Sequence, residues 1–457
     1  MVSRRGVIAI AAAMAASGAS ARAGTSADGL QILRARKVNL FLMGPDRPPT
    51  AAWSFSEKGT PAILRARQGA EFKVRIVNEI GEDLWLHWFG VRGPSELMTV
   101  NVMPGPDNAV ECVFTPPDAG TFWLGPMANV SRIRDMGLGA MFIVEEHEPL
   151  PVLADLPLIL DDWMIDDDGV MDTSFGDMNA VVGEGRLGNW FTANNRFRPS
   201  VDLPAKAYGR LRLLNAANAR IMNLQFKGDD PLVIALDGQP VPLSNLGSQA
   251  LTLAPGQRAD LLVQGRDGDT RMAMNVLGDV VELMTLLAAP QTSLPEIPDN
   301  FALPANPLAA EPDWQSATVV PLVIEGGEKG GLKGALYGGE MKDMRSLLEA
   351  GMAWAFNGVA GAGGPPLGTF VKGAAVVLAV ENRTTFDQPL HIHGHVWREI
   401  GRSGQPVEVS PWRDTALVAA GRTLKLGFVA DNPGTWAIQS LVAERADAGL
   451  LAAFVVA

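Results

Sequence analysis

Four of the five histidines in this chain of 457 residues fall in two short segments. One segment reads Leu86-His87-Trp88-Phe89-Gly90, and the other reads Leu390-His391-Ile392-His393-Gly394-His395. Side chains two positions apart point to the same face of a β-strand, so His391 and His393 are expected side by side. Imidazole is a common ligand of copper and zinc, and two rings on one face predict a metal-binding pair.

His87 is expected to join this pair, because the two segments occupy equivalent places in a repeated unit. His87 follows Asn78 by nine residues, and His391 follows Asn382 by nine residues. Together with His393 they predict one mononuclear copper or zinc site between two repeats. The alternative is that the three histidines are hydrogen-bonded residues of a domain interface that holds no metal.

Each repeat contains an alternating strand that ends in asparagine. Residues 69–78 and 373–382 both run from glycine to asparagine with the alternation of a half-buried strand, and a shorter copy spans 209–215. A second shared segment reads Gly120-Thr121-Phe122 in one unit and Gly434-Thr435-Trp436 in another. Three units of short strands and Gly, Pro and Asn turns predict three β-sandwiches in one chain.

The domain boundaries follow from composition. A Glu- and Pro-containing stretch lies near residues 145–156, and six prolines lie between 289 and 313. Helix is scarce, with one short helix expected within 343–353. The expected parts are an export signal over 1–23, domain 1 over 30–147, domain 2 over 152–290, a linker over 291–315 and domain 3 over 316–457.

Overall charge and cysteine content exclude some classes of protein. The net charge is −12, which argues against a nucleic-acid partner because binding to phosphates requires cationic side chains. Cys112 is the only cysteine, so no disulfide can form within the chain. A buried structural thiol is the expected state of Cys112.

The N-terminus has the pattern of a twin-arginine export signal. Ser3-Arg4-Arg5 precedes an apolar run over residues 8–16, and Ala21-Arg22-Ala23 is a small-x-small cleavage pattern. The alternative is a chance arginine pair in front of an ordinary secretory signal. Both predict export, and the twin-arginine route predicts a periplasmic protein. No later apolar run is long enough to span a bilayer, so no transmembrane segment is expected after cleavage.

Four motifs in order resemble those of the multicopper oxidases, a family that includes laccases. Its His-Trp-His-Gly motif corresponds to residues 87–90, and its Gly-Thr-Phe-Trp-Tyr-His-Ser-His motif to residues 120–127. Its His-Pro-x-His-x-His-Gly motif corresponds to residues 388–394, and its His-Cys-His-x-x-x-His-x-x-x-Gly-Met motif to residues 439–450. The resemblance covers nearly the whole chain after residue 23. It implies an all-β fold of three cupredoxin-like Greek-key β-sandwich domains.

The resemblance also implies where copper ligands would lie, and most of those residues differ here. The type 1 copper positions hold Gln388, Ser440, Arg445 and Leu450. The type 3 positions hold Phe89, Gly125, Met127, His393, Gln439 and Leu441, whereas both type 2 positions keep histidine, as His87 and His391. The full set needs about ten histidines and one cysteine, more histidines than this chain has. Four-electron reduction of oxygen by the family's route is therefore not expected.

The replacement residues suggest how the vacated space is filled. Phe89, Met127, Leu441 and Leu450 are expected to pack into it, and Arg445 to pair with Glu444 or another acidic neighbour. Asp161-Asp162 and Asp166-Asp167-Asp168 are expected to form a solvated acidic face.

Two functions remain open at this point. The first is a non-catalytic periplasmic scaffold or binding protein with no catalytic residues, no cofactor and an unidentified protein partner, in cell division or the envelope. This is similar in kind to the copper-free division protein SufI of the same family. The second is a copper-binding oxidoreductase or metal carrier with one type 2-like site for at most one copper or zinc ion, at His87, His391 and His393. A decaying oxidase without a role is a third, weaker hypothesis.

Overall fold

The computed structural model of the protein describes residues 24, 25, 29–148, 150–289, 297, 301–401 and 410–457. The expected export signal, residues 1–23, lies outside the described residues, as does much of the first part of the expected linker. Of that linker, the described residues 297 and 301–313 belong to no helix or strand.

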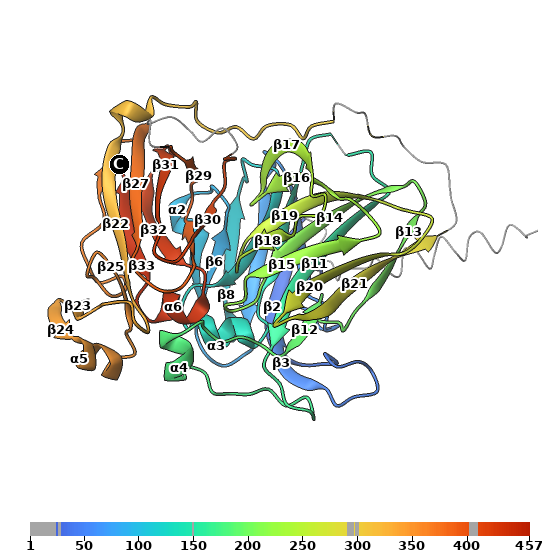
Figure 1. The fold of residues 1–457 in the computed structure, drawn as a ribbon, viewed down its shortest axis with the longest axis horizontal. Coiled ribbons are helices and arrows are strands. Elements are labelled where there is room, and N and C mark those ends of the chain that lie inside the picture. The colour runs from blue at the N-terminus through green and yellow to red at the C-terminus, as the bar shows by residue number, and fades with distance from the viewer. Residues whose placement is uncertain (1–23, 26–28, 149, 290–296, 298–300, 402–409) are drawn as a thin grey trace, which may run out of the picture.

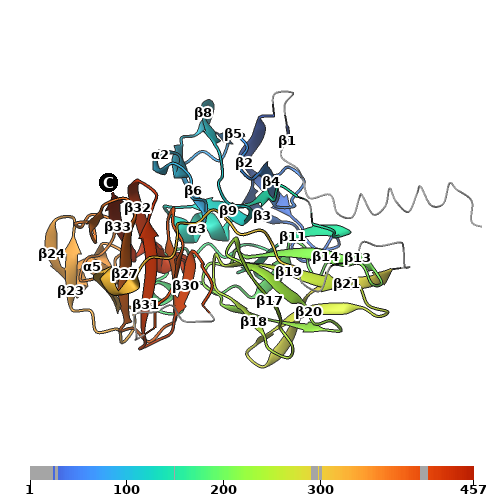
Figure 2. The same ribbon diagram turned by 90° about the horizontal axis from the view of Figure 1, so that it is seen from above.

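The strands form three pairs of sheets, which confirms the predicted all-β fold of cupredoxin-like sandwiches (Figure 1). Domain 3 lies on one side in Figure 1, domain 2 on the other, and domain 1 between them; Figure 2 shows the three grouped around a common centre. In domain 1, one sheet contains β1 (Gly24–Thr25), β2 (Gln31–Leu40), β5 (Phe72–Asn78) and β8 (Gly105–Phe114) in that order, with β3 (Thr50–Ser54) also paired to β2. The other contains β4 (Ala62–Arg67), β10 (Ala140–Glu145), β9 (Gly120–Pro126), β6 (Leu84–Phe89) and β7 (Thr99–Val102).

Domains 2 and 3 are built in the same way. One sheet of domain 2 contains, in order, β12 (Trp190–Ala193), β11 (Ala154–Trp163), β14 (Tyr208–Asn215), β19 (Arg258–Gln264), β16 (Leu232–Leu236) and β17 (Gln239–Asn245). The other contains, in order, β13 (Ser200–Pro204), β21 (Asp279–Ala289), β20 (Thr270–Val276), β15 (Met222–Lys227) and β18 (Leu251–Leu253). One sheet of domain 3 contains, in order, β25 (Trp354–Phe356), β22 (Thr318–Gly326), β27 (Ala374–Asn382), β31 (Thr423–Ala430) and β29 (Trp397–Glu399). The other contains, in order, β26 (Thr369–Phe370), β33 (Leu451–Val456), β32 (Gly434–Ser440), β28 (Gln388–Ile392) and β30 (Thr415–Val418). A separate hairpin consists of β23 (Gly334–Tyr337) and β24 (Glu340–Asp343).

The helices are short. They are α2 (Ser95–Met98), α3 (Val130–Asp135), α4 (Met178–Val182), α5 (Met344–Glu349), α6 (Ala443–Asp447) and the 3₁₀ turn η1 (Trp314–Ser316). Helix α5 lies within residues 343–353, where the sequence predicts one, and the Asp343 carboxylate caps it by accepting from the Ser346 N–H. Among the described residues, no helix has the length and apolar character needed to cross a bilayer.

The three closing asparagines of the repeats have the same structural role in each domain. Asn78, Asn215 and Asn382 end β5, β14 and β27 and are at most 1% exposed. Each side-chain oxygen accepts from the backbone N–H two residues later, and each side-chain amide donates to carbonyls on two other segments. Burial of an amide requires such partners, which explains why this residue ends all three copies.

A buried ion pair joins the three domains where they meet. Arg258 begins β19 of domain 2, and its guanidinium donates to both carboxylate oxygens of Asp414 in domain 3, at 2.9 Å for Nη1 to Oδ1. Arg258 Nε donates to the Thr121 carbonyl of domain 1 at 3.1 Å, and its Nη1 lies 3.5 Å from Oδ1 of Asp237. The side chains of Arg258, Asp237 and Asp414 are 0% exposed. Both charges are therefore satisfied entirely by protein groups from different domains.

Gly90 shows how tightly this junction is packed. A Cβ at Gly90 would lie 2.4 Å from Arg258 Nη2 and 2.5 Å from Asp414 Oδ2. The glycine has a φ of +84°, a conformation that L side chains rarely adopt. The glycine of the His87–Gly90 motif therefore makes room for an ion pair formed by the other two domains.

Replacing Arg258 with methionine is expected to destabilise the whole junction. It leaves Asp414 buried without its cation, whereas Asp237 keeps its ion pair with Arg413. Removal of one partner of a buried pair costs about 3–5 kcal/mol. The measurement is the shift of the urea and thermal unfolding transitions. Arg271→Met is the matched control, because the Arg271–Glu282 pair is exposed and worth about 1 kcal/mol or less. Equal effects of the two substitutions would contradict this account of the junction.

Candidate functional site

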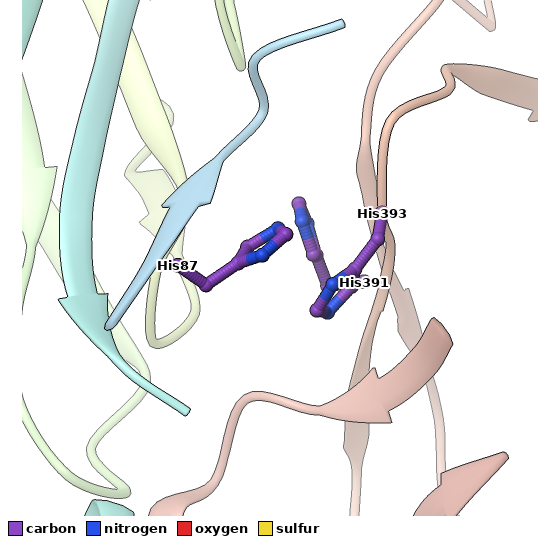
Figure 3. A group of neighbouring side chains, drawn as sticks. All are labelled: His87, His391 and His393. Atoms are coloured by element: carbon purple, nitrogen blue, oxygen red, sulfur yellow. The ribbon is translucent and has the colours of Figure 1, made fainter. Parts of the chain in front are cut away.

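The structure brings together the three histidines singled out from the sequence. His87 lies on β6 of domain 1, His391 lies on β28 of domain 3, and His393 directly follows β28. Figure 3 shows the three rings converging from the two domains. One ligand atom from each ring lies within 4.8 Å of the other two, and all three side chains are buried.

Matching threonines hold two of these rings. Strand pairing places Thr99 opposite His87 and Thr415 opposite His391. The Nδ1 atoms lie 2.8 Å from Thr99 Oγ1 for His87 and 3.0 Å from Thr415 Oγ1 for His391. The two repeats therefore orient their type 2-equivalent histidines by the same contact.

The junction ion pair fixes the proton on His391. Asp414 Oδ1 accepts from the Thr415 hydroxyl at 2.7 Å and also lies 3.2 Å from His391 Nδ1. The neighbouring Arg258 guanidinium holds the pKa of Asp414 well below its usual range, although burial alone would raise it. With an ionised carboxylate and a hydroxyl already donating its proton, both neighbours of His391 Nδ1 accept. Nδ1 therefore carries a proton, so a neutral His391 ring has its lone pair on Nε2.

Two of the three rings are held in the neutral state that metal binding requires. Burial lowers the pKa of His87 and His393 well below the usual value, and the neighbouring His391 lowers both further. These rings are therefore neutral at neutral pH. The Nε2 atoms of His87, His391 and His393 are buried without a hydrogen-bond partner among the described residues. Buried polar atoms normally have a partner, so three such atoms in one place fit a single cation.

The remaining histidines lie outside this group. His395 is buried, its Nδ1 lies 3.0 Å from the His393 carbonyl oxygen, and its ring packs against Phe428, Trp436 and Phe454. Burial lowers the pKa of His395 to about 4. His147 is exposed after β10. Neither contributes a ligand atom to the group formed by the other three.

At the type 1-equivalent positions, the guanidinium of Arg445 is buried and contacts Gln388. Arg445 is 1% exposed, and its Nη1 donates to the Asp387 carbonyl at 2.7 Å and to Gln388 Oε1 at 3.1 Å. Its Nη2 donates to the carbonyls of Gly183 and Glu184, at 3.2 and 3.5 Å, from the segment after α4 of domain 2. Its guanidinium carbon also lies 5.0 Å from the Trp354 ring and 4.9 Å from the Phe386 ring.

This arrangement corrects the expected partner of Arg445. No carboxylate lies within ion-pair distance of it among the described residues, and Glu444 instead accepts from Asn218. Carbonyl oxygens and aromatic faces balance the buried charge. Burial lowers the pKa of Arg445 to about 10, so the guanidinium stays cationic at neutral pH.

The type 3-equivalent positions next to the histidines are mostly apolar. Phe89 stacks on Trp123 at a centroid distance of 4.2 Å and lies 5.3 Å from the His391 ring. Phe89, Trp123 and Leu441 belong to a buried apolar cluster contributed by all three domains, whose other members are Ile63, Met141, Ile143, Ile159 and Leu214. Leu450 is fully buried in the core of domain 3, as expected. Met127 is only partly buried, so it contributes less buried surface than Phe89 and Leu441.

Cys112 is the buried thiol that the sequence predicts. It lies on β8 in the core of domain 1, and burial raises its pKa to about 11. A thiol with a raised pKa stays protonated at neutral pH and is a poor nucleophile and a poor metal ligand.

The acidic run is only partly a solvated face. Asp166, Asp167 and Asp168 are exposed, as expected. Asp162 is 2% exposed and accepts from Arg220 Nε at 2.6 Å, which corrects the expectation for that residue. It also accepts from the Gly188 N–H and therefore orders the chain between β11 and β12.

Thr99, Thr415, Asp414 and Arg258 were missed by reasoning from the sequence. They follow or precede the histidines by irregular separations, and their side chains are common structural types. Only the strand pairing between β6 and β7, and between β28 and β30, reveals that the two threonines are equivalent.

Comparison with known proteins agrees with the fold. Multicopper oxidase profiles match residues 43–149 and 341–457. The chain is 25% identical to the multicopper oxidase MmcO of Mycobacterium tuberculosis over 414 residues, 82% of this chain and 77% of MmcO. The crystal structure of a multi-copper oxidase from Pseudomonas thermotolerans superposes with a TM-score of 0.80 at 29% identity, covering 95% of this chain and all of the other.

A second set of relatives consists of cell division proteins. The cell division protein FtsP of Yersinia pestis is 26% identical over 279 residues, 55% of this chain and 58% of FtsP. FtsP of Escherichia coli is 27% identical over 234 residues, 48% of each chain. The chain thus matches about half the length of these division proteins. Profiles at both ends, full-length structural agreement and the four ordered motifs all lead to one conclusion: the chain belongs to the multicopper oxidase family.

Proposed function

We propose that this protein is an exported, non-catalytic scaffold or binding protein that lacks the type 1 and type 3 copper centres of its family. The observation that carries the proposal is the environment of Arg445. A guanidinium with carbonyl partners occupies the group of residues that the resemblance equates with the type 1 ligands. A fixed cation and a copper ion do not share one buried site, because among the described residues no carboxylate lies within ion-pair distance of Arg445 to offset a second charge.

The type 3-equivalent positions support the same proposal. Phe89 and Leu441 offer no lone pair, and their side chains are part of an apolar cluster that seals the three domains together. Copper requires nitrogen, sulfur or oxygen ligands, so the residues around Phe89 do not fit a paired copper centre. Without a type 1 centre there is also no entry point for electrons.

Domain 2 additionally covers the type 1-equivalent region. The Val181 carbonyl accepts from Trp354 Nε1 at 2.7 Å, and the Val182 carbonyl accepts from the Glu328 N–H at 2.7 Å. The segment after α4 therefore packs on the Arg445 side of domain 3. An oxidase substrate docking at that place would have to displace it.

The biological role follows from the division relatives and the N-terminal pattern. FtsP is named as a cell division protein, and this chain shares about half of its length. With the twin-arginine signal over residues 1–23, the proposed location is the periplasm, and the proposed partner is a protein of the division or envelope machinery. A scaffold acts through its surface, so the buried histidines are dispensable for that role.

The test compares the wild type with a variant that carries His87→Ala, His391→Ala and His393→Ala. In a strain lacking the gene, we expect both to restore cell length and resistance to envelope stress equally. Purified wild type supplied with copper is expected to consume no more oxygen with a phenolic reductant than the variant. The Pseudomonas thermotolerans oxidase serves as the positive control. Oxygen turnover by the wild type, or a complete failure of a folded variant in cells, would refute the scaffold proposal.

A second candidate function has a specific observation in its favour. The three converging Nε2 atoms fit one copper or zinc ion, held by His87 from domain 1 and by His391 and His393 from domain 3. Such an ion would keep open positions for water or substrate and would supply Lewis-acid or limited one-electron chemistry. The protein would then be a metal carrier or a single-copper oxidoreductase.

Metal content separates this candidate from a metal-free interface. If the triad binds metal, elemental analysis after folding with copper and zinc is expected to give one ion per chain, lost in His87→Ala and kept in His147→Ala. Thr415→Val is expected to weaken binding about 10–100-fold, because the hydroxyl orients the His391 ring. Less than stoichiometric metal in the wild type, or retention of the ion by His87→Ala, would eliminate the single-ion site.

A further inference from the structure

The hairpin between β20 and β21 ends in an apolar tip, defined here as Leu277, Gly278, Asp279 and Val280. Val276 pairs with Asp279, so Leu277 and Gly278 form a two-residue turn. Leu277 is 103% exposed and Val280 is 69% exposed. Leucine at the end of a protruding hairpin thus makes no packing contribution to its own domain.

The backbone makes this leucine more unusual. Leu277 has a φ of +52° and Gly278 a φ of +98°, the pattern of a turn that favours Asn-Gly. A leucine at the first position is disfavoured by its own backbone conformation and by its contact with water. Neither local structure nor domain packing explains the residue, which indicates a role in contact with another molecule.

A pocket that complements the tip lies between domains 2 and 3. Its volume is about 350 Å³, and its apolar walls include Trp397, Leu417, Leu424 and Leu426. Arg398 and Arg413 also line it; each already pairs with one carboxylate, of Glu311 and Asp237 respectively, and Glu399 is the third charged residue of the lining. An apolar pocket lined by two guanidiniums and one carboxylate suits an aliphatic group that carries a carboxylate beside it.

The tip and the pocket lie near each other on the same molecule. In the second sheet of domain 2, β20 pairs with β15 and β15 pairs with β18, and Figure 1 shows these strands as neighbours. The pocket begins at Thr252 on β18, two strands from the tip, or about 10 Å across the sheet. A two-residue turn leaves the tip no length of chain with which to fold back into its own pocket.

We propose that the occupant of the pocket is the tip of a second copy of this chain. A surface that carries a projecting group and its complementary pocket side by side is self-complementary, and a two-fold axis then buries both pairs at once. Leu277 and Val280 would pack on the apolar walls, and the Asp279 carboxylate would accept from Arg398 or Arg413. This dimer is independent of the metal question and of the scaffold role.

Sedimentation velocity of the mature protein, from micromolar concentration to about 0.1 mM, tests the proposal directly. The wild type is expected to dimerise. Leu277→Asn and Leu424→Glu are each expected to weaken the dimer by at least about tenfold, because they remove the tip and spoil the pocket. Val371→Asn, at another exposed apolar residue (73% exposed), is expected to leave the dimer unchanged.

Two further measurements serve as controls for this test. Leu277→Asn introduces the residue the turn favours, so its melting temperature is expected to equal or exceed that of the wild type, which excludes unfolding as the cause. An equimolar mixture of Leu277→Asn and Leu424→Glu retains one intact tip-and-pocket contact, and is expected to associate more strongly than either variant alone. A wild type that is monomeric at every concentration, an unchanged Leu277→Asn dimer, or no gain on mixing would each overturn the proposal.

Discussion

The bidentate pair between Arg258 and Asp414 is the interaction on which the rest of this structure depends. It places a cation from domain 2 and a carboxylate from domain 3 beside the glycine of the first histidine motif in domain 1. Because Asp414 is kept ionised, the Thr415 hydroxyl donates to it and His391 Nδ1 keeps its proton. One buried ion pair therefore sets both the packing of three domains and the chemical state of a histidine in the candidate site.

Charge explains which of the family's metal positions remain usable. At the type 1-equivalent position the buried cation is Arg445, balanced by carbonyl oxygens and aromatic rings. Around Phe89 and Leu441 the space is apolar and needs no balancing charge. Where His87, His391 and His393 meet, three buried imidazole nitrogens remain without a partner among the described residues. The molecule thus keeps the architecture of an oxidase while offering a cation three nitrogen ligands at a single point.

The repeats made much of this fold and part of its site predictable. The three closing asparagines, the equal offsets to His87 and His391, and the two-residue spacing to His393 all correspond to real equivalences in space. Arg258 and Asp414 are 156 residues apart, and no periodic pattern connects them. The prediction of a carboxylate partner for Arg445 was wrong, because its actual partners include main-chain carbonyls. Every residue has such a carbonyl, so no sequence pattern marks it as a partner. Asp162 was expected in solvent because its partner Arg220 follows 58 residues later on another segment.

Anomalous X-ray diffraction at the copper and zinc edges, from crystals grown with both metals, would locate any metal in this protein. We expect no anomalous peak beside Arg445 and none between Phe89 and Leu441, with at most one peak where the Nε2 atoms of His87, His391 and His393 converge. A peak among Gln388, Ser440 and Arg445, or a pair of peaks next to Phe89, would show that copper centres form despite the residues that occupy their place. Such a result would contradict the proposed loss of the type 1 and type 3 centres and would favour an oxidase function.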